Sequence, residues 1–219
     1  MTQPIYAVYG VSGCGRSVMP LAREQLKLLD VPENRLVFID DNPGERMVNG
    51  QQVLTYSEFK EVEASEHKVV IAIADSTVRE KLAECCSKDG IKPWSIASSN
   101  IVMMDDVQIG EGSILSPFVT LTSNIKIGRH FQANIYSYVE HDCVIGDFVT
   151  FAPAVKCNGN ILIEDHAYIS AGAVIKQGEP GKPLVIGMGA VVGMGAVVTK
   201  SVPPGAIVIG NPAKELIKN

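Results

Sequence analysis

The sequence predicts a small α/β domain of Rossmann type followed by a parallel β-helix of six-residue repeats, and three observations carry this prediction. Apolar residues recur at every sixth position over most of the second half. Continuous apolar runs alternate with helical segments in the first half. The 219 residues, 46% hydrophobic and 20% charged, have the composition of a globular chain of one large or two small domains. We expect residues 1–98 to form the α/β domain and residues 99–219 the β-helix.

The α/β domain is expected from three apolar runs at residues 4–9, 36–39 and 69–74, which are typical of buried strands. Helical segments follow the first and third runs, at about residues 17–29 and 76–88. Strands without polar alternation belong to parallel sheets that are covered on both faces. The order of strand, helix and strand therefore predicts a small Rossmann-like fold.

Two features of this domain indicate a nucleotide. Gly10, Gly13 and Gly15 lie between the first strand and the first helix, where backbone N–H groups can bind a phosphate. Their order is G-x-x-G-x-G rather than the dinucleotide pattern G-x-G-x-x-G, so a full NAD site is disfavoured. Asp40 and Asp41 end the second strand, where doubly wound sheets bind ligands. A glycine turn and a helix-capping aspartate without a ligand are the alternative.

The β-helix is expected from a series of apolar residues that starts at Ile109 and recurs at every sixth position to Ile175. Five inserted residues interrupt the series, which resumes at Ile186 and ends at Val198. This period fits neither an α-helix nor an alternating strand, so an ordinary β-sandwich is a poor alternative. It fits a triangular prism in which three units close a coil of 18 residues around the apolar side chains. We expect glycines to supply backbone freedom at its corners, at Gly110, Gly128, Gly146, Gly187 and Gly193.

The composition excludes several classes of protein. The chain has 19 Lys and Arg against 24 Asp and Glu and no basic run, so nucleic-acid binding is not expected. Five cysteines without a Cys-x-x-Cys pair indicate reduced thiols in a cytoplasmic protein, and no signal peptide is expected. The longest uncharged stretch, residues 183–199, is short for a membrane span. The four histidines lack a metal-binding spacing, so no metal is expected, and zinc-dependent carbonic anhydrases with such a helix are disfavoured.

His141 is the candidate catalytic base. It follows the inward residue Val139 by two positions, so we expect it at a corner of the prism with its side chain pointing outward. Neutral histidine is the usual base near neutral pH, and Asp142 or Glu140 could fix its tautomer and raise its pKa. A lone histidine at a corner is more often a solvated turn residue.

Other histidines and cysteines have simpler interpretations. We expect His130 and His166 to be solvated turn residues. Cys143 and Cys157 occupy inward positions and are expected to be small core residues, because no partner base for an acyl-cysteine is evident.

Three motifs carry a resemblance to a known family. They are Tyr-Gly-x-Ser-Gly-x-Gly at residues 9–15, Phe-Ile-Asp-Asp at residues 38–41, and Val-Glu-His-Asp-Cys-Val-Ile-Gly at residues 139–146. Over essentially the whole chain, the sequence resembles the bacterial sugar-nucleotide acetyltransferases related to the bacillosamine-pathway N-acetyltransferase and the sialic acid O-acetyltransferase (the PglD/NeuD family). The resemblance implies a left-handed β-helix and a homotrimer. It also implies acetyl-CoA in clefts between adjacent β-helices and a nucleotide-activated amino sugar on the N-terminal domain.

The resemblance also implies roles for individual residues. His141 matches the general base, and Asp142 matches the acidic neighbour that raises its basicity. Many relatives have histidine where Cys14 and Thr150 stand, which leaves the phosphate contact at Cys14 to backbone N–H groups. The positions that match contacts with the sugar nucleotide are Ser12, Gly13, Cys14, Asp40, Asp41 and Ala74, and those that match the acetyl-CoA cleft are Asn134, Thr150, Gly159, Ala171 and Met194.

The expected activity is transfer of an acetyl group from acetyl-CoA to the C4 amine of a UDP-linked 4-amino-4,6-dideoxy sugar, in surface-glycan or glycoprotein synthesis. Two enzymatic alternatives remain: the same chemistry on a sugar hydroxyl, and N-acetylation of a GDP-linked amino sugar. A third alternative is a scaffold without catalysis whose N-terminal domain senses a sugar nucleotide.

Overall fold

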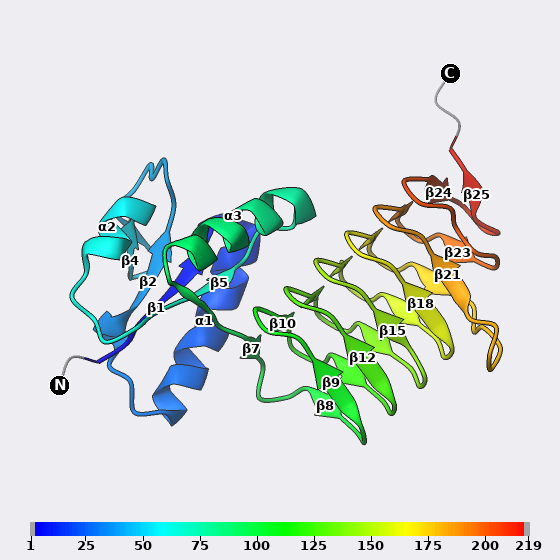
Figure 1. Ribbon diagram of the computed structural model, residues 1–219, viewed down its shortest axis with the longest axis horizontal. Coiled ribbons are helices and arrows are strands. Elements are labelled where there is room, and N and C mark those ends of the chain that lie inside the picture. Colours follow the sequence, from blue (N-terminus) through cyan, green and yellow to red (C-terminus); the bar gives the residue numbers. More distant parts are fainter. Residues whose placement is uncertain (1–2, 217–219) are drawn as a thin grey trace. The chain divides into compact units, whose positions relative to one another are not determined.

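The computed structural model describes residues 3–216, and the contacts within it divide the chain into two units (Figure 1). The first unit contains the residues up to Ala97 together with Glu111–Ile114. The second unit contains Ser98–Gly110 and the residues from Leu115 onward. One short segment of the repeat region therefore belongs to the first unit, so a single boundary in the chain does not separate the two units.

The first unit is built on a six-stranded sheet of order β3-β4-β2-β1-β5-β6. All neighbouring strands pair in parallel except β3 and β4, as the continuous apolar runs predict. The strands are β1 (Ile5–Tyr9), β2 (Leu36–Ile39), β3 (Met47–Val48), β4 (Gln51–Leu54), β5 (His67–Ile71) and β6 (Lys92–Pro93).

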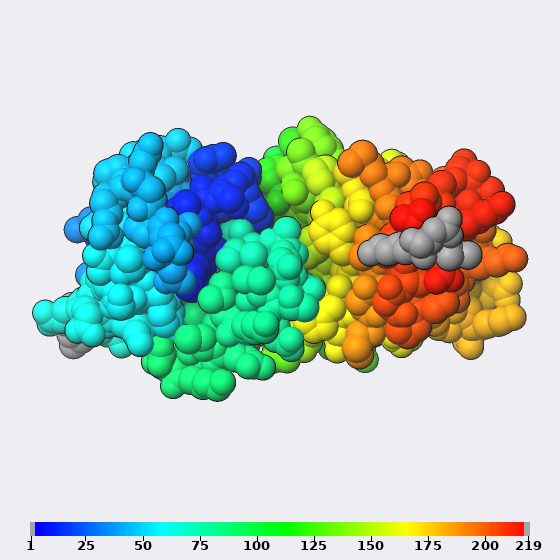
Figure 2. Space-filling view, turned by 90° about the horizontal axis from the view of Figure 1, so that it is seen from above, coloured from blue at the N-terminus to red at the C-terminus, as the bar shows by residue number. Residues whose placement is uncertain are grey.

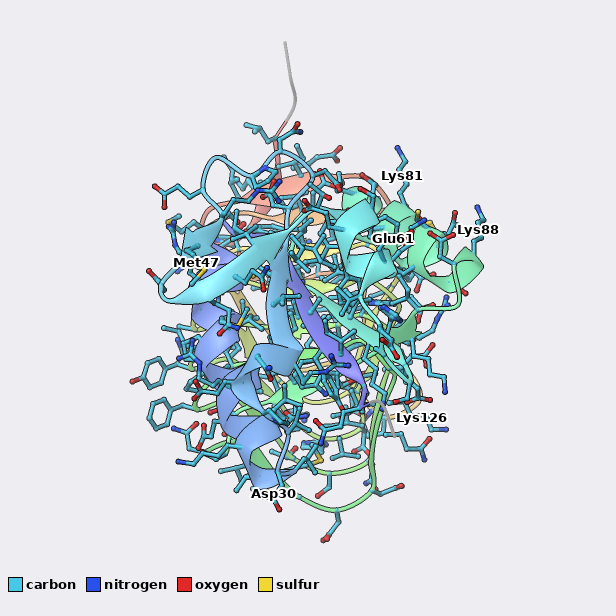
Figure 3. The ribbon with its side chains drawn as sticks, turned by 90° about the vertical axis from the view of Figure 1, so that its left-hand side faces the viewer. Asp30, Met47, Glu61, Lys81, Lys88 and Lys126 are labelled. Carbon is cyan, nitrogen blue, oxygen red and sulfur yellow. The ribbon has the colours of Figure 1, made fainter. Side chains whose placement is uncertain are left out.

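Helices cover both faces of this sheet, which is why its central strands are apolar on both sides. Helix α1 (Gly13–Leu28) packs Met19 and Ala22 on one face, and a 3-10 turn, η1 (Glu33–Arg35), precedes β2. Helices α2 (Tyr56–Glu61) and α3 (Ser76–Lys88) lie on the other face, which the labels at Glu61 and Lys88 mark in Figure 3. No helix within residues 3–216 is long and apolar enough to cross a membrane.

Local contacts explain where these elements differ from the prediction. Strand β5 ends at Ile71 instead of residue 74, and the carbonyl groups of Ile73 and Ala74 accept hydrogen bonds from the buried Arg79 instead of from a neighbouring strand. Helix α2 was not expected, although Thr55 and Glu58 form a capping box at its start.

The second unit is a parallel β-helix whose coils stack with a constant offset. Thr120 pairs with Tyr138, and Thr150 with Tyr168, in each case 18 positions along the chain. The coils appear as adjoining bands of colour in Figure 2. The short strand β7 (Ile96–Ala97) is the last strand before the second unit begins at Ser98. The first sheet of the β-helix contains β10 (Ile114–Leu115), β13 (Gln132–Ala133), β16 (Thr150–Phe151), β19 (Tyr168–Ile169), β22 (Val191–Val192), β24 (Ile207–Ile209) and the antiparallel β25 (Lys214–Glu215). The second sheet contains β8 (Val102–Met103), β11 (Thr120–Leu121), β14 (Tyr138–Val139), β17 (Lys156–Cys157), β20 (Val174–Ile175) and β23 (Val197–Val198). The third sheet contains β9 (Val107–Ile109), β12 (Ile125–Ile127), β15 (Val144–Ile145), β18 (Ile161–Ile163) and β21 (Leu184–Ile186).

The apolar series fills the interior of this β-helix as predicted. Residues of the series from Leu115 to Val198 are buried, and Ile109 packs against their cluster. The small or branched residues four positions later, such as Val155 and Ala173, are buried as well. The insertion appears in the strand register, since Ile161 pairs with Leu184, 23 positions away.

The role predicted for the corner glycines is wrong. Gly128 and Gly146 do not have positive φ; a Cβ on Gly128 would lie 2.4 Å from Asp147 Oδ1 and 2.6 Å from the carbonyl carbon of Gly146. These glycines allow stacked coils to approach each other closely. The left-handed conformation falls two residues after these glycines, on His130 (φ 54°) and Phe148 (φ 58°).

Candidate active site

His141 lies at the corner between β14 and β15, which we call the His141 corner. Its imidazole Nδ1 lies 2.8 Å from Asp142 Oδ2. In the tautomer that makes this bond, Nδ1–H donates to the carboxylate and Nε2 keeps its lone pair for a proton from a substrate. This hydrogen bond is the main reason that the pKa of His141 is raised. The side chain is 44% exposed, as the sequence predicted for an outward corner residue.

The stacked coils hold this pair from both sides. Asn124, one coil earlier, donates from Nδ2 to Asp142 Oδ1 over 3.2 Å. The hydrogen bonds from His141 and Asn124 lower the pKa of Asp142 and keep it a carboxylate. Gly159, one coil later, faces the imidazole, because a Cβ there would lie 2.6 Å from both Cε1 and Nε2 of His141. Any side chain at position 159 would overlap the imidazole ring, so this packing requires glycine.

Four of the five residues predicted to contact acetyl-CoA lie on two corners of the prism, and Thr150 lies in a strand. Gly159 belongs to the His141 corner. Asn134, Ala171 and Met194 follow strands of the first sheet, at what we call the Asn134 corner, and Thr150 begins a strand of that sheet. Met194 is 80% exposed, whereas Thr150 is buried.

In the first unit, the glycine-rich turn brings backbone N–H groups to the start of α1. Gly10 has a φ of 108°, and a Cβ on Gly15 would lie 1.8 Å from the carbonyl oxygen of Gly10, so the turn closes only with glycine at position 15. Ser12 precedes the helix in an extended conformation and makes no side-chain cap. The exposed Ser12 and Gly13 and the half-buried Cys14 therefore surround helix N–H groups that can bind an anion.

The two aspartates after β2 have different surroundings. Asp40 Oδ1 accepts a hydrogen bond from the backbone N–H of Asn42 over 2.9 Å, which stabilises the turn. Asp41 Oδ2 accepts from the Tyr9 hydroxyl over 2.5 Å, and its Oδ1 accepts from the Tyr56 N–H over 3.3 Å. The rings of Tyr9 and Tyr56 stack with their centroids 5.9 Å apart. The carboxylate of Asp41 is thus fixed between β1 and α2.

Ala74 lies in the loop between β5 and α3, and a buried cation supports that loop. Arg79 donates from Nη1 to the carbonyl oxygens of Ile73 over 2.6 Å and Ala74 over 3.2 Å. Burial lowers the pKa of Arg79 to about 10, and the same charge opposes the rise that burial causes in the pKa of the Cys14 thiol. The glycine-rich turn and this loop therefore lie within electrostatic reach of one cation.

Comparison with known proteins decides the family. Residues 6–85 match the model of the PglD N-terminal domain. The chain is 49% identical over 212 residues, 97% of its length and 96% of the relative's, to the GDP-perosamine N-acetyltransferase of Escherichia coli O157:H7. The chain belongs to the PglD/NeuD family of sugar-nucleotide acetyltransferases.

Two solved structures share the whole architecture of this family member. WeeI from Acinetobacter baumannii AYE is 59% identical, with a TM-score of 0.95 over 98% of this chain and all of that one. The acetyltransferase domain of PglB from Neisseria gonorrhoeae FA1090, in complex with acetyl coenzyme A, is 26% identical, with a TM-score of 0.83 over 99% of this chain and all of that one. The fold is therefore the expected Rossmann-like domain followed by a left-handed β-helix.

The site differs from the sequence-based description in several places. The expectation that His130 is solvated is wrong: the residue is 5% exposed and its ring stacks on Phe148, which also stacks on the half-buried His166. Cys143 and Cys157 are buried core residues, as predicted. Among the described residues, no group of three or more His, Cys, Asp or Glu could hold a metal ion.

The sequence description also omitted residues that act on the candidate site through contacts. Asn124 could have been found from the coil length, because it precedes Asp142 by 18 positions. Tyr9 and Arg79 carried no such signal, because their contacts depend on strand order and on a buried loop.

Proposed function

We propose that the chain transfers the acetyl group of acetyl-CoA to the amine of a GDP-linked 4-amino-4,6-dideoxy sugar, of which GDP-perosamine is the leading candidate. The observation that carries this proposal is the 49% identity to a GDP-perosamine N-acetyltransferase over nearly the whole of both chains. The sequence first favoured a UDP-linked sugar, and this relative favours the GDP-linked alternative instead. That relative is an N-acetyltransferase, which also favours acetylation of an amine over acetylation of a hydroxyl.

His141 is suited to act as the general base of this reaction. As the sugar amine attacks the thioester carbonyl carbon, Nε2 accepts a proton from the nitrogen while Nδ1–H remains bonded to Asp142. The new C–N bond forms, the C–S bond breaks, and the leaving CoA thiolate takes the proton back from the imidazolium. The raised pKa of His141 makes it a stronger base than an ordinary histidine.

The first unit is suited to hold the nucleotide. Backbone N–H groups at Gly13 and Cys14 can donate to the diphosphate, and Ala74 lies in the loop that follows the neighbouring strand. Asp41 is fixed by two hydrogen bonds and can present its carboxylate as an acceptor for donors of the nucleoside. Asp40 supports the turn beside it.

A homotrimer would complete the acetyl-CoA site. Apart from Thr150, the positions assigned to acetyl-CoA lie on the His141 corner and on the Asn134 corner, and a cleft between adjacent β-helices can combine one corner of each kind from two chains. All five cysteines are free thiols, which fits a cytoplasmic enzyme.

The test is an assay with purified protein, acetyl-CoA and either GDP-perosamine or a UDP-linked 4-amino-4,6-dideoxy sugar. We expect stoichiometric thiol release and an acetylated GDP-sugar whose acetyl group resists mild alkali, as an amide does and an ester does not. Faster turnover of the UDP-sugar would overturn the nucleotide assignment. Absence of thiol release with both would favour the sensing scaffold, and light scattering of the same sample tests the trimer.

A further inference from the structure

Three residues on two consecutive coils form a hydrogen-bonded chain at the His141 corner. Asn124 Nδ2 donates to Asp142 Oδ1 over 3.2 Å, and Asp142 Oδ2 lies 2.8 Å from His141 Nδ1. Each oxygen of the carboxylate therefore has its own partner. The backbone is held in the same way, because the N–H of Asp142 donates to the carbonyl oxygen of Ser123 over 3.1 Å.

Because the His141–Asp142 pair is exposed, the hydrogen bond from Asn124 can restrict the motion of Asp142. The Asp142 side chain is 49% exposed, so water competes for both of its oxygens and the carboxylate could rotate away from the imidazole. A donor on the preceding coil restricts that rotation, because coils of a β-helix stack with a fixed register. Gly159 restricts the imidazole from the following coil.

We propose that Asn124 is a positioning residue for the catalytic base: its amide fixes the Asp142 carboxylate, which in turn holds His141 with Nε2 directed at the substrate. The proposal rests on the proposed function, in which His141 is the base. Asn124 acts through Asp142 and need not touch either substrate. Its side chain must be a donor here, because an aspartate at position 124 would place a second negative charge against Asp142.

The charged and titratable groups that act most strongly on the imidazole set the direction of the change in its pKa. Asp142, Glu140 and the Cys143 thiol are the groups that act on His141, and all three raise its pKa. Loss of the Asn124 bond loosens Asp142 and lowers the pKa of His141. An added negative charge at position 124 raises it.

Two variants test the proposal. Asn124→Gly removes the amide without backbone strain, because the residue has a φ of 59° that glycine adopts freely. We expect kcat to fall on the order of tenfold, the factor for one hydrogen bond to a charged group at an exposed site, with both KM values nearly unchanged. The acid limb of the pH–rate profile should move to lower pH. In Asn124→Asp, kcat should fall and the limb should move to higher pH.

Asp106→Gly is the matched control, because Asp106 occupies the same corner one coil earlier and also has a left-handed φ of 54°. It should leave kcat and the pH profile unchanged. Wild-type kcat and an unmoved limb in Asn124→Gly would overturn the proposal, as would equal losses in Asp106→Gly, which would indicate a purely structural corner. If His141→Ala also retained activity, the proposed function itself would fail, and the two failures are thus distinguishable.

Discussion

The two units assemble their candidate sites in different ways. In the β-helix, Asn124, Asp142 and Gly159 meet around His141 because each lies about one 18-residue coil from the next, so contacts follow directly from chain spacing. In the α/β unit, Tyr9 and Asp41 meet because β1 and β2 are neighbours in the sheet, although 32 positions separate them. A repeat thus makes site geometry predictable and local, whereas a wound sheet makes it depend on the whole topology.

The largest effect on activity is expected at the His141 corner, whose contacts follow from the 18-residue spacing along the chain. His141→Ala should lower kcat by about 10²–10⁴, the usual contribution of a general base, because it removes the imidazole that takes the proton from the amine. Binding of both substrates should change little. Steady-state kinetics measure this, with His141→Gln as a control that keeps side-chain bulk below Gly159. A loss smaller than tenfold would reduce His141 to a turn residue.

The second prediction concerns Asp41 in the α/β unit, where the contacts of the candidate site depend on the order of the strands. Asp41→Ala should raise KM for the GDP-sugar on the order of 10- to 100-fold, because it removes a charge-assisted hydrogen bond worth roughly 1.5–3 kcal/mol. KM for acetyl-CoA should stay nearly constant. Asp40→Ala should mainly lower the melting temperature, because Asp40 caps the turn at Asn42.

Tyr9→Phe separates the two contributions of Asp41. It keeps the carboxylate and removes the hydroxyl that holds it, so the rise in KM should be smaller than in Asp41→Ala. If these variants weaken acetyl-CoA and spare the sugar nucleotide, the division of labour between the two units is wrong.

A third prediction uses pH. Asp142 raises the pKa of His141, and the base works only when it is unprotonated, so activity should rise with pH through a pKa above the ordinary histidine value. Asp142→Asn removes the negative charge and lowers that pKa. The acid limb of kcat/KM should therefore shift to lower pH while the plateau falls. A limb that keeps its position would show that Asp142 does not act on the base.

The sequence predicted more of the second unit than of the first, for physical reasons. The six-residue series located the interior, the insertion and the outward position of His141, because every coil repeats the same contacts. It misjudged the corner glycines, since the period alone does not distinguish a left-handed residue from one that a neighbouring coil approaches closely. It also missed the burial of His130, which depends on ring stacking with Phe148. In the α/β unit, the contacts of Arg79 could not be read from any periodicity.

The smallest predicted effect tests the corners themselves. Ala154 and Gly172 occupy the same corner on consecutive coils, with φ values of 59° and 69°. A left-handed conformation costs an L-residue about 1–2 kcal/mol, and the greater freedom of unfolded glycine offsets part of that, so Ala154→Gly should stabilise by about 0.5–1 kcal/mol. Gly172→Ala should destabilise by a similar amount, and because a Cβ there meets nothing within 4 Å, the cost is that of the backbone alone.

Denaturant unfolding of both variants measures these changes. Both variants are compared at one fixed protein concentration, because the apparent stability of an oligomer depends on the concentration of its subunits. Opposite signs in the two variants would establish that the corner conformation, and not the side chain, sets the stability. The same sign in both would mean that neighbouring coils decide it. In that case, the reasoning that uses glycine to isolate the amide of Asn124 would need a different replacement, such as Asn124→Ser, which keeps a short polar side chain at the corner.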